Sequence, residues 1–425
     1  MRQNSRRRWP GGRWILLVGL LAAALGLMVQ AADTGAQVGA ATQPGKAGDW
    51  PQWRGPNRDG ISAETAWASA WSDSKPKVLW KAPVGVGYSA AAVAGKRVYT
   101  MGRQDDKETV WCLNADTGKP IWSRSYPSRK GGYPGTRATP TVDGRHVFTL
   151  GRNGHVCCFQ AADGKPVWSK DLRAELKAAT PGWGFASSPL VEGNLLILNM
   201  GTAGVALNKA TGKVVWQTGR GKAGHASPVA YKDGNERRFL IFAANGLVSV
   251  SARTGQRRWA LPWKTSYDVH ASDPIVSDGM LFMCSGYGTG CALLKLGPGR
   301  PTPLWSNKDL APHFGSPVLY KGHLYGVHGN VGNAAVRCIE FKTGKVKWTG
   351  PRTKMSSLML ADGKLIVMVD GGGLLVAEAS PEKFNVLGKT RVLSGTCWTM
   401  PVLAAGRIYC RSHSGELACV DVSKK

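Results

Sequence analysis

The amino-acid sequence predicts an all-β protein, an eight-bladed β-propeller, in which short antiparallel strands form blades around a central channel. Three observations support this fold class. A turn motif that ends in tryptophan recurs along the chain, its tryptophans are 43 to 48 residues apart, and the repeat region shows no extended helical pattern with caps. A repeat in the forties, built on short strands, is typical of propeller blades.

The clearest copy of the motif is Ala115–Trp122, A-D-T-G-K-P-I-W. Its Thr-Gly pair supplies a turn position that needs a positive φ. We expect the Trp that follows to pack against the neighbouring blade. Further copies occupy Ala162–Trp168, Ala210–Trp216, Arg253–Trp259 and Lys342–Trp348, and Trp305 closes a degenerate one.

The number of blades follows from a second recurrent segment, in which a small residue and Pro begin a strand. Six copies are regular: Ala138–Val142, Ser187–Val191, Ala226–Val229, Ser272–Val276, Gly315–Leu319 and Thr399–Leu403. Two less regular copies start at Tyr88 and Met355. The last set, Cys397–Val422, has only three strands. We therefore expect the strand at Val78–Trp80 to pair with it and close the ring, since closure removes an open edge. Seven blades is the alternative.

Together, the T-G-K-x-x-W turn, the S-P-x-V strand and the eightfold count resemble the PQQ-like repeat family over Pro76–Val422. That family includes quinoprotein alcohol dehydrogenases and the BamB subunit of the outer-membrane β-barrel assembly machinery. The resemblance implies either an oxidoreductase that uses PQQ and calcium or a scaffold that works by β-augmentation or by docking partner segments on exposed loops. The segment Asp49–Gly60 resembles the leader of exported bacterial members. Fold alone does not choose between these functions.

The N-terminal region predicts export. Arg6, Arg7, Arg8 and Arg13 form a basic segment before the apolar run Trp14–Val29, as in a secretory signal peptide. We expect a signal peptide at 1–31, a flexible linker at 32–48, an irregular extension rich in Trp, Pro and Gly at 49–75, and the propeller at 76–423. The expected location is the periplasm or cell envelope, with a retained N-terminal anchor as the alternative. The sequence leaves Sec and Tat export open.

The chain carries a net charge of +28, or +23 without the five arginines of the first thirteen residues. Such a charge favours polyanions. The basic residues are spread out, however, and many occupy blade edges and turns, where Lys and Arg also prevent strand pairing. We expect envelope proteins, an anionic polymer or a small molecule as partners, no nucleic acid, at most peripheral membrane contact, and a monomer.

An enzyme would need groups that the sequence does not make evident. No acidic pair stands out at the starts of the inner strands as a calcium ligand set, and the haem motif C-x-x-C-H is absent. The adjacent Cys157 and Cys158 resemble the vicinal pair of quinoprotein alcohol dehydrogenases. Cys158, however, lies ten residues before a blade Trp, in a column of small residues, which predicts packing. Cys284 and Cys291 flank a hairpin tip at Tyr287-Gly288 and could form a disulfide.

Residues just before the inner strands are expected to line the mouth of the channel. The candidates are Tyr88, Arg137, Trp183, Phe185, His225, Tyr267, His270, His313, Phe314 and Trp398. Such a set would suit an anionic or planar ligand. No catalytic residue and no metal ligand is assigned. We expect a non-catalytic binding or scaffold protein of the envelope, similar to BamB. The alternatives are a PQQ-dependent alcohol or sugar dehydrogenase and a carbohydrate-binding propeller.

Overall fold

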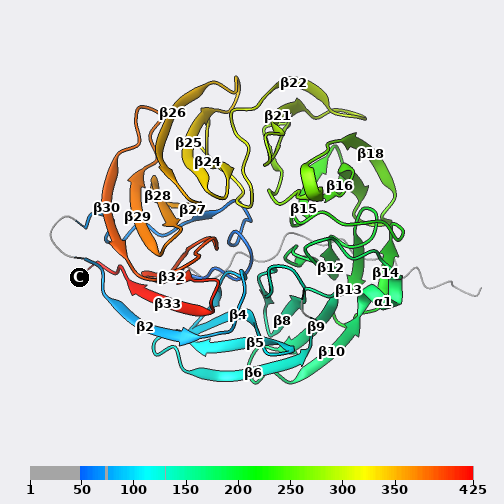
Figure 1. Cartoon of the computed structure of the whole chain (residues 1–425). Helices are drawn as coiled ribbons and strands as arrows, with labels where there is room; N and C mark the ends of the chain where they lie inside the picture. Colours follow the sequence, from blue (N-terminus) through cyan, green and yellow to red (C-terminus); the bar gives the residue numbers. More distant parts are fainter. Residues whose placement is uncertain (1–47, 72–74, 130, 425) are drawn as a thin grey trace, which may run out of the picture. The chain divides into compact units, whose positions relative to one another are not determined.

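The computed structural model describes residues 48–71, 75–129 and 131–424, all of which belong to one compact unit. Eight four-stranded antiparallel meanders are arranged in a ring, with strands such as β6 and β10 on the outside (Figure 1). This confirms the predicted eight-bladed propeller. The predictions for residues 1–47, a signal peptide and most of a linker, lie outside the described residues. No helix of the described residues is long and apolar enough to cross a membrane.

Seven blades are continuous in sequence. Their strands are β3–β6 (Ala92–Ala94, Arg97–Gln104, Lys107–Asn114, Pro120–Pro127), β7–β10 (Thr141–Asp143, His146–Leu150, His155–Gln160, Pro166–Asp171), β11–β14 (Leu190–Glu192, Leu195–Leu198, Val205–Asn208, Val214–Gln217), β15–β18 (Val229–Asp233, Glu236–Ala243, Gly246–Ser251, Arg257–Pro262), β19–β22 (Ile275–Ser277, Met280–Ser285, Gly290–Lys295, Thr302–Asn307), β23–β26 (Val318–Tyr320, His323–Asn330, Asn333–Glu340, Val346–Thr353) and β27–β30 (Ser356–Ala361, Lys364–Val369, Gly373–Glu378, Val386–Arg391). The described helices are short: α1 (Leu172–Leu176) and the 3₁₀ turn η1 (Ser266–Asp268).

The eighth blade joins the two ends of the propeller. Its three inner strands are β31–β33 (Val402–Ala404, Arg407–Arg411, Glu416–Asp421) and its outer strand is β2 (Val78–Pro83). Strand β2, in blue, lies beside β33, in red (Figure 1), and Trp80 is opposite Cys419 in the antiparallel pair. The predicted closure of the ring is therefore confirmed.

The Trp of most blades contacts the repeated turn of the next blade and donates a hydrogen bond beside it. We call this contact between blades the staple. Trp80 Nε1 donates a 2.9 Å hydrogen bond to the carbonyl of Ala115, just before the turn of the following blade. Gly118 in that turn has φ +70°, and a Cβ on it would lie 2.6 Å from the Trp80 ring. Glycine is therefore required both by its conformation and by its contact. The same hydrogen bond joins Trp216 to Ala252 at 2.9 Å. Trp259 Nε1 lacks a partner, and the turn of its neighbouring blade departs from the repeat.

The column of small residues lies opposite the staple tryptophans. Cys112, Cys158, Ala206, Ser249, Cys338 and Cys419 are each the cross-strand partner of one of them. Cys158 is buried beside this packing, and the Cys157 thiol lies 3.6 Å from Ser169 Oγ. The vicinal pair therefore belongs to the blade core, as the register predicted.

Cys284 and Cys291 face each other across the β20–β21 hairpin, as predicted, because they are direct cross-strand partners. Both are buried and both are free thiols in the structure. The thiol of Cys291 donates to Asn307 Oδ1 at 3.1 Å instead. The structure therefore contains the predicted juxtaposition and not the disulfide.

The leader, defined as residues 49–60, passes over the inner strands at one end of the channel and crosses the centre of the ring (Figure 1). Trp50 is buried and forms a β-bridge with Val93 of β3. At its other end, the short strand β1 (Ile61–Ser62) pairs in parallel with β27. Between these two attachments, Trp53 donates a hydrogen bond to Asp273, which precedes β19 in the blade opposite that of β3. The leader therefore extends across this end of the channel.

Candidate functional site

A cavity of about 290 Å³ occupies the channel above the leader. We call it the cup, because the leader closes one end and the other end opens to solvent. Trp53 of the leader lies in its lining together with residues that precede the inner strands. The lining contains Trp53, Tyr88, Tyr133, Arg137, Trp183, Ala186, Ser188, His225, Ser227, Val269, Ala271, Asp273, Tyr287, His313, Phe314, Gly315, Ser316, Val331, Ser357, Leu358, Trp398, Thr399 and Met400. A volume near 300 Å³ is appropriate for a small-molecule site.

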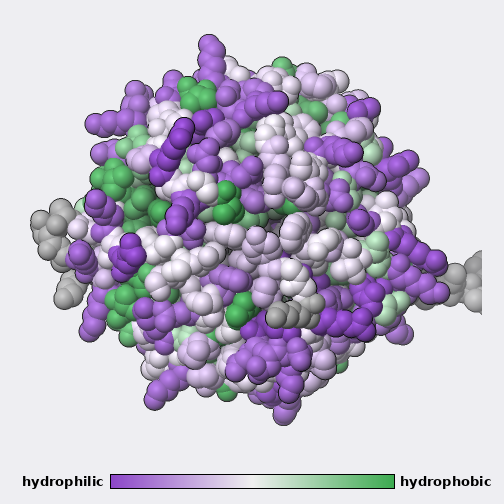
Figure 2. Space-filling view, in the orientation of Figure 1, coloured by the Kyte–Doolittle hydropathy of each residue, from purple (hydrophilic) through white to green (hydrophobic). Residues whose placement is uncertain are grey.

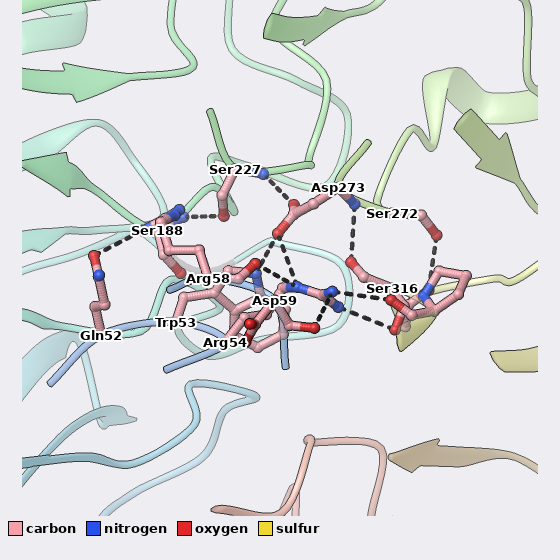
Figure 3. Close-up of polar contacts among 12 residues, drawn as sticks. Gln52, Trp53, Arg54, Arg58, Asp59, Ser188, Ser227, Ser272, Asp273 and Ser316 are labelled. Carbon is pink, nitrogen blue, oxygen red and sulfur yellow. Dashed lines mark hydrogen bonds and ion pairs between the residues drawn. The ribbon is translucent and has the colours of Figure 1, made fainter. Parts of the chain in front are cut away.

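A belt of hydrogen bonds runs around the base of the cup from blade to blade (Figure 3). The side chain of the residue before the repeated Pro accepts a hydrogen bond from the backbone N–H of its counterpart in the preceding blade. The successive acceptors are Ser188 at 2.9 Å, Ser227 at 2.9 Å, Asp273 at 2.7 Å and Ser316 at 2.9 Å. The small residue of the S-P motif is thus a link between blades, and it places a hydroxyl on the cup.

Asp273 is the acidic member of this belt, at a position where its neighbours carry hydroxyls. Its Oδ1 accepts from Ser227 N, and its Oδ2 accepts from Trp53 Nε1 at 2.7 Å. Arg54 Nε lies 3.9 Å from Oδ2. Burial raises the pKa of Asp273, and the charges of Arg54 and Arg58 oppose this change. The carboxylate is therefore occupied by contacts that fix the leader.

The two arginines of the leader are buried beneath the cup (Figure 3). Arg54 donates to the carbonyls of Ser316 and Pro317 at 3.1 and 2.9 Å, and so holds the leader to β23. Arg58 donates to the carbonyl of Pro189 at 3.2 Å, while its Nε and Nη2 lack partners. Burial lowers the pKa of Arg58 to about 10. Both guanidinium groups thus add positive charge below the cup.

Stacked rings form much of the wall. Trp398 has Tyr88 at 5.8 Å and Phe314 at 5.0 Å, with interplanar angles of 18° and 26°. Tyr88 belongs to the blade after Trp398 in the ring, whereas Phe314 comes from a blade before it. His313 continues the stack at 3.8 Å from Phe314. Two rings from other blades thus pack against the Trp398 indole, which itself lines the cup.

The polar groups of the wall are few and well defined. The guanidinium of Arg137 lies over the Tyr88 ring at 5.4 Å and donates to the carbonyls of Gly135 and Tyr133 at 2.9 and 2.8 Å. Burial lowers the pKa of Arg137 to about 10. Neither ring nitrogen of His225 makes a well-formed hydrogen bond, and Trp398 Nε1 also lacks a partner.

His225 is a neutral imidazole at pH 7. Burial lowers the pKa of His225 to about 4, Arg137 adds to the lowering, and the backbone of Asp268 opposes it. Burial also lowers the pKa of His313 to about 4. The His313 Nε2 is paired with the Tyr287 hydroxyl at 2.9 Å.

Most of the predicted mouth residues line the cup: Tyr88, Arg137, Trp183, His225, His313, Phe314 and Trp398. Three do not. Phe185 is 1% exposed and packs in the core of neighbouring blades. The ring of His270 turns away, because its Nε2 pairs with the Trp263 carbonyl at 2.8 Å and it stacks on Phe242. Tyr267 is 68% exposed in η1, and its ring contacts Tyr287. Their placement at the mouth is corrected accordingly.

The lining residues that were not predicted include three aromatic side chains and one acidic side chain: Trp53, Tyr133, Tyr287 and Asp273. A sequence signal existed for Asp273, because it is the acidic exception among the residues before the repeated prolines. Trp53 belongs to the irregular extension; its indole packs against the propeller core and also forms part of the cup. Tyr133 and Tyr287 lie in loops between strands, where repeat alignment has no reference position.

The residues of the cup do not fit the calcium site of a quinoprotein. Calcium needs several oxygen ligands, including free carboxylates. Asp273 is the carboxylate of the cup lining, and its oxygens accept hydrogen bonds beside Arg54. Within the described residues, no group of three or more His, Cys, Asp or Glu side chains could hold a metal ion.

Comparisons with known proteins give a family match and several similar structures. The family profile described as outer membrane protein assembly factor BamB matches residues 106–350. No curated protein sequence matches the chain. BamB from Moraxella catarrhalis has a similar structure, with a TM-score of 0.63 and 15% identity over 82% of this chain and 100% of that one.

Quinoproteins share the fold as well. The quinohemoprotein alcohol dehydrogenase from Comamonas testosteroni gives a TM-score of 0.70 at 12% identity, over 90% of this chain and 82% of that one. A europium-containing methanol dehydrogenase gives 0.65 at 13% identity, over 86% and 90%. At such identities the likeness shows the fold alone. The profile match covers more than half of the sequence, and the chain therefore belongs to the PQQ-like propeller family described as outer membrane protein assembly factor BamB.

Proposed function

We propose that this protein is an exported, non-catalytic binding protein of the cell envelope, with the cup as its ligand site and its outer surface available to partner proteins. The observation that carries the proposal is that both carboxylate oxygens of Asp273 already accept hydrogen bonds within the protein. This carboxylate of the cup lining accepts hydrogen bonds from Trp53 and Ser227 and lies beside Arg54. It is committed to holding the leader, so it is a poor general base and a poor metal ligand.

The remaining polar groups of the cup suit recognition. His225 and Trp398 have unpaired nitrogens, which a bound molecule can satisfy. Unpaired buried donors cost free energy until a partner arrives, so such groups favour occupancy of the site. The matched family contains the BamB assembly factor, and this supports a scaffold role at the envelope. Hydrophilic side chains, with hydrophobic ones scattered among them, are spread over the face of the propeller that Figure 2 shows.

A cofactor titration tests the proposal. The purified chain is mixed with PQQ and Ca²⁺, quinone absorbance is followed, and dye reduction is assayed with ethanol and with glucose. We expect no turnover above that of protein-free controls. Saturable PQQ binding with alcohol- or sugar-dependent dye reduction would establish the oxidoreductase alternative and reject the proposal.

The envelope assignment needs its own measurement. Expression in a Gram-negative host, followed by fractionation and N-terminal sequencing, should place the protein outside the cytoplasm with its N-terminus near residue 32. Recovery of the intact chain in the cytoplasm would contradict export. Cross-linking in envelope extracts then identifies the protein partners.

A further inference from the structure

We infer that the cup binds a small hydroxylated carboxylate, of which a sugar acid is the simplest example. The inference rests on the proposed binding function and adds the chemical class of the ligand. It follows from three independent properties of the lining: its charge, the orientation of its rings, and the hydrogen-bonding capacity that the protein leaves unused.

Charge indicates an anion. Arg137 lies in the wall, and Arg54 and Arg58 are buried below it, whereas Asp273 and the half-buried Asp59 are the nearby carboxylates. Arg152 and Glu108 also act on Arg137, so four guanidinium groups are set against three acids. Two N–H groups of Arg137 bind carbonyls, and an arginine has five to offer. A carboxylate in the cup would receive charge-assisted hydrogen bonds from Arg137.

Ring orientation argues against a ligand that must be sandwiched. Tyr88 and Phe314 stack on Trp398, so protein rings already occupy part of its stacking surface. Aromatic edges carry partial positive charge, while the faces carry the negative charge. Trp398 Nε1, which lacks a partner, strengthens this positive edge. Electron-rich oxygen atoms are therefore better complements to this wall than a flat aromatic ring.

The unused hydrogen-bonding groups require a ligand that both accepts and donates. A neutral imidazole has one N–H donor and one acceptor nitrogen, and both nitrogens of His225 are buried without a well-formed bond. The hydroxyls of Ser188 and Ser227 accept backbone hydrogen bonds, and their protons are not used among the described residues. Alcohol groups on the ligand would satisfy these positions, whereas a simple carboxylate would leave the acceptor of His225 unpaired.

The closed end limits how a larger molecule can enter. Trp53 and the leader block passage through the ring, so a polymer could insert only its terminal unit. The cup thus recognises a free sugar acid or the end residue of an acidic glycan through the same contacts. The shared chemistry is one carboxylate with several hydroxyls on a compact ring.

Isothermal titration calorimetry of the full mature chain tests the inference. The probes are D-glucuronate, its neutral counterpart D-glucose, and cyclohexanecarboxylate, which has the charge without the hydroxyls. We expect saturable one-to-one binding of glucuronate and at least tenfold weaker binding of the other two. Absence of glucuronate binding, or equal affinity for glucose, would overturn the inference. An oligoglucuronate binding at the same stoichiometry distinguishes end recognition from free sugar acid alone.

Variants locate the site. Arg137→Gln should weaken glucuronate binding at least tenfold, and His225→Phe should weaken it while leaving cyclohexanecarboxylate unchanged. The matched control is Arg124→Gln, whose guanidinium binds carbonyls of Ser123 and Asp163 at the outer edge of a blade. Thermal melts verify that each variant is folded. Unchanged affinity in folded Arg137→Gln would contradict the site.

The sugar-acid titration tests the ligand class, and the PQQ titration tests the binding function, so the two proposals can be rejected independently. If no sugar acid binds and PQQ gives no turnover, the ligand class is wrong and the binding function stands. If PQQ with Ca²⁺ supports dye reduction, the binding function itself is wrong.

Discussion

The indole nitrogen of Trp53 donates a 2.7 Å hydrogen bond to Oδ2 of Asp273, which is 220 positions later in the chain. One partner belongs to the irregular leader and the other to the belt that links the blades. This contact joins the leader to the ring and forms the base of the cup. It therefore couples the stability of the leader to the integrity of the site.

Replacing Asp273 with Ala should be strongly destabilising. The change leaves the buried Arg54 and Arg58 without their nearest carboxylate and removes the acceptor for Trp53 and Ser227. Breaking a buried charge pair costs about 3–5 kcal/mol. Urea denaturation of the variant measures this loss. Glu382→Ala, at an exposed residue, is the control, and an equal small effect in both variants would show that Asp273 does not fix the leader.

Two glycine substitutions separate backbone strain from loss of the staple. Gly95 has φ +59° and open space where the methyl group of an alanine would lie. Gly95→Ala should therefore lower the free energy of unfolding by about 1 kcal/mol, the strain of holding an alanine in the left-handed conformation. Gly118→Ala adds a clash with the Trp80 ring and should cost about 1–3 kcal/mol more. Equal losses in thermal or urea unfolding would mean that the Trp80 contact is not tight.

The tryptophans test the hydrogen bond of the staple. Trp216 and Trp259 are 7% and 6% exposed, but Trp216 Nε1 binds the Ala252 carbonyl and Trp259 Nε1 binds nothing. Changing each to Phe removes a similar area. Trp216→Phe should be more destabilising by about 1–3 kcal/mol, because it leaves a buried carbonyl unpaired. The free energy of unfolding of the two variants, compared directly, decides the point.

The buried histidines predict a loss of stability in mild acid. With a pKa of about 4 in the folded state, His225 takes up a proton near pH 6.5 only when the chain unfolds. Stability is thus retained above pH 6.5 and falls as the pH drops towards 4, by up to about 3 kcal/mol from this residue. Unfolding free energies between pH 7 and 4.5 should fall less steeply in His225→Phe.

Thiol counting tests the hairpin cysteines. All nine cysteines are buried free thiols, so native protein should react slowly with an aromatic disulfide reagent. In denaturant without reductant, every cysteine should react. Two fewer reactive thiols, with a peptide linking Cys284 to Cys291 in unreduced digests, would instead show that the bridge forms in the purified protein.

The fold was predictable because the repeat encodes it several times over. The Gly of each turn packs against the Trp of the preceding blade, that Trp lies opposite a small residue of its own blade, and this arrangement recurs around the ring. Even the closing strand at Val78–Pro83 was identified from its resemblance to the other Trp strands. Because the turn motif occurs in most blades, a single degenerate copy, such as the one before Trp305, did not change the predicted number of blades.

The site was only partly predictable, because it is built from what the repeats do not share. Alignment placed Tyr88 and Trp398 at the channel, since they precede inner strands. It could not show that the His270 ring turns towards Trp263, because side-chain direction depends on local partners. Nor could it bring Trp53 under the ring, since the path of an irregular segment is set by tertiary contacts such as those of Arg54.

The pairing of β2 with β33 also sets an order for biogenesis. The blade that seals the ring takes its outer strand from the beginning of the propeller and its inner strands from near the end of the chain. The side chain of Lys81 in β2 donates a hydrogen bond to Glu416, which follows 335 residues later. This contact cannot form until Glu416 has been synthesised or has crossed a membrane that the chain enters with its N-terminus first. Final closure is therefore a late event, and an unfinished chain carries an exposed β-edge that aggregation or a chaperone can engage first.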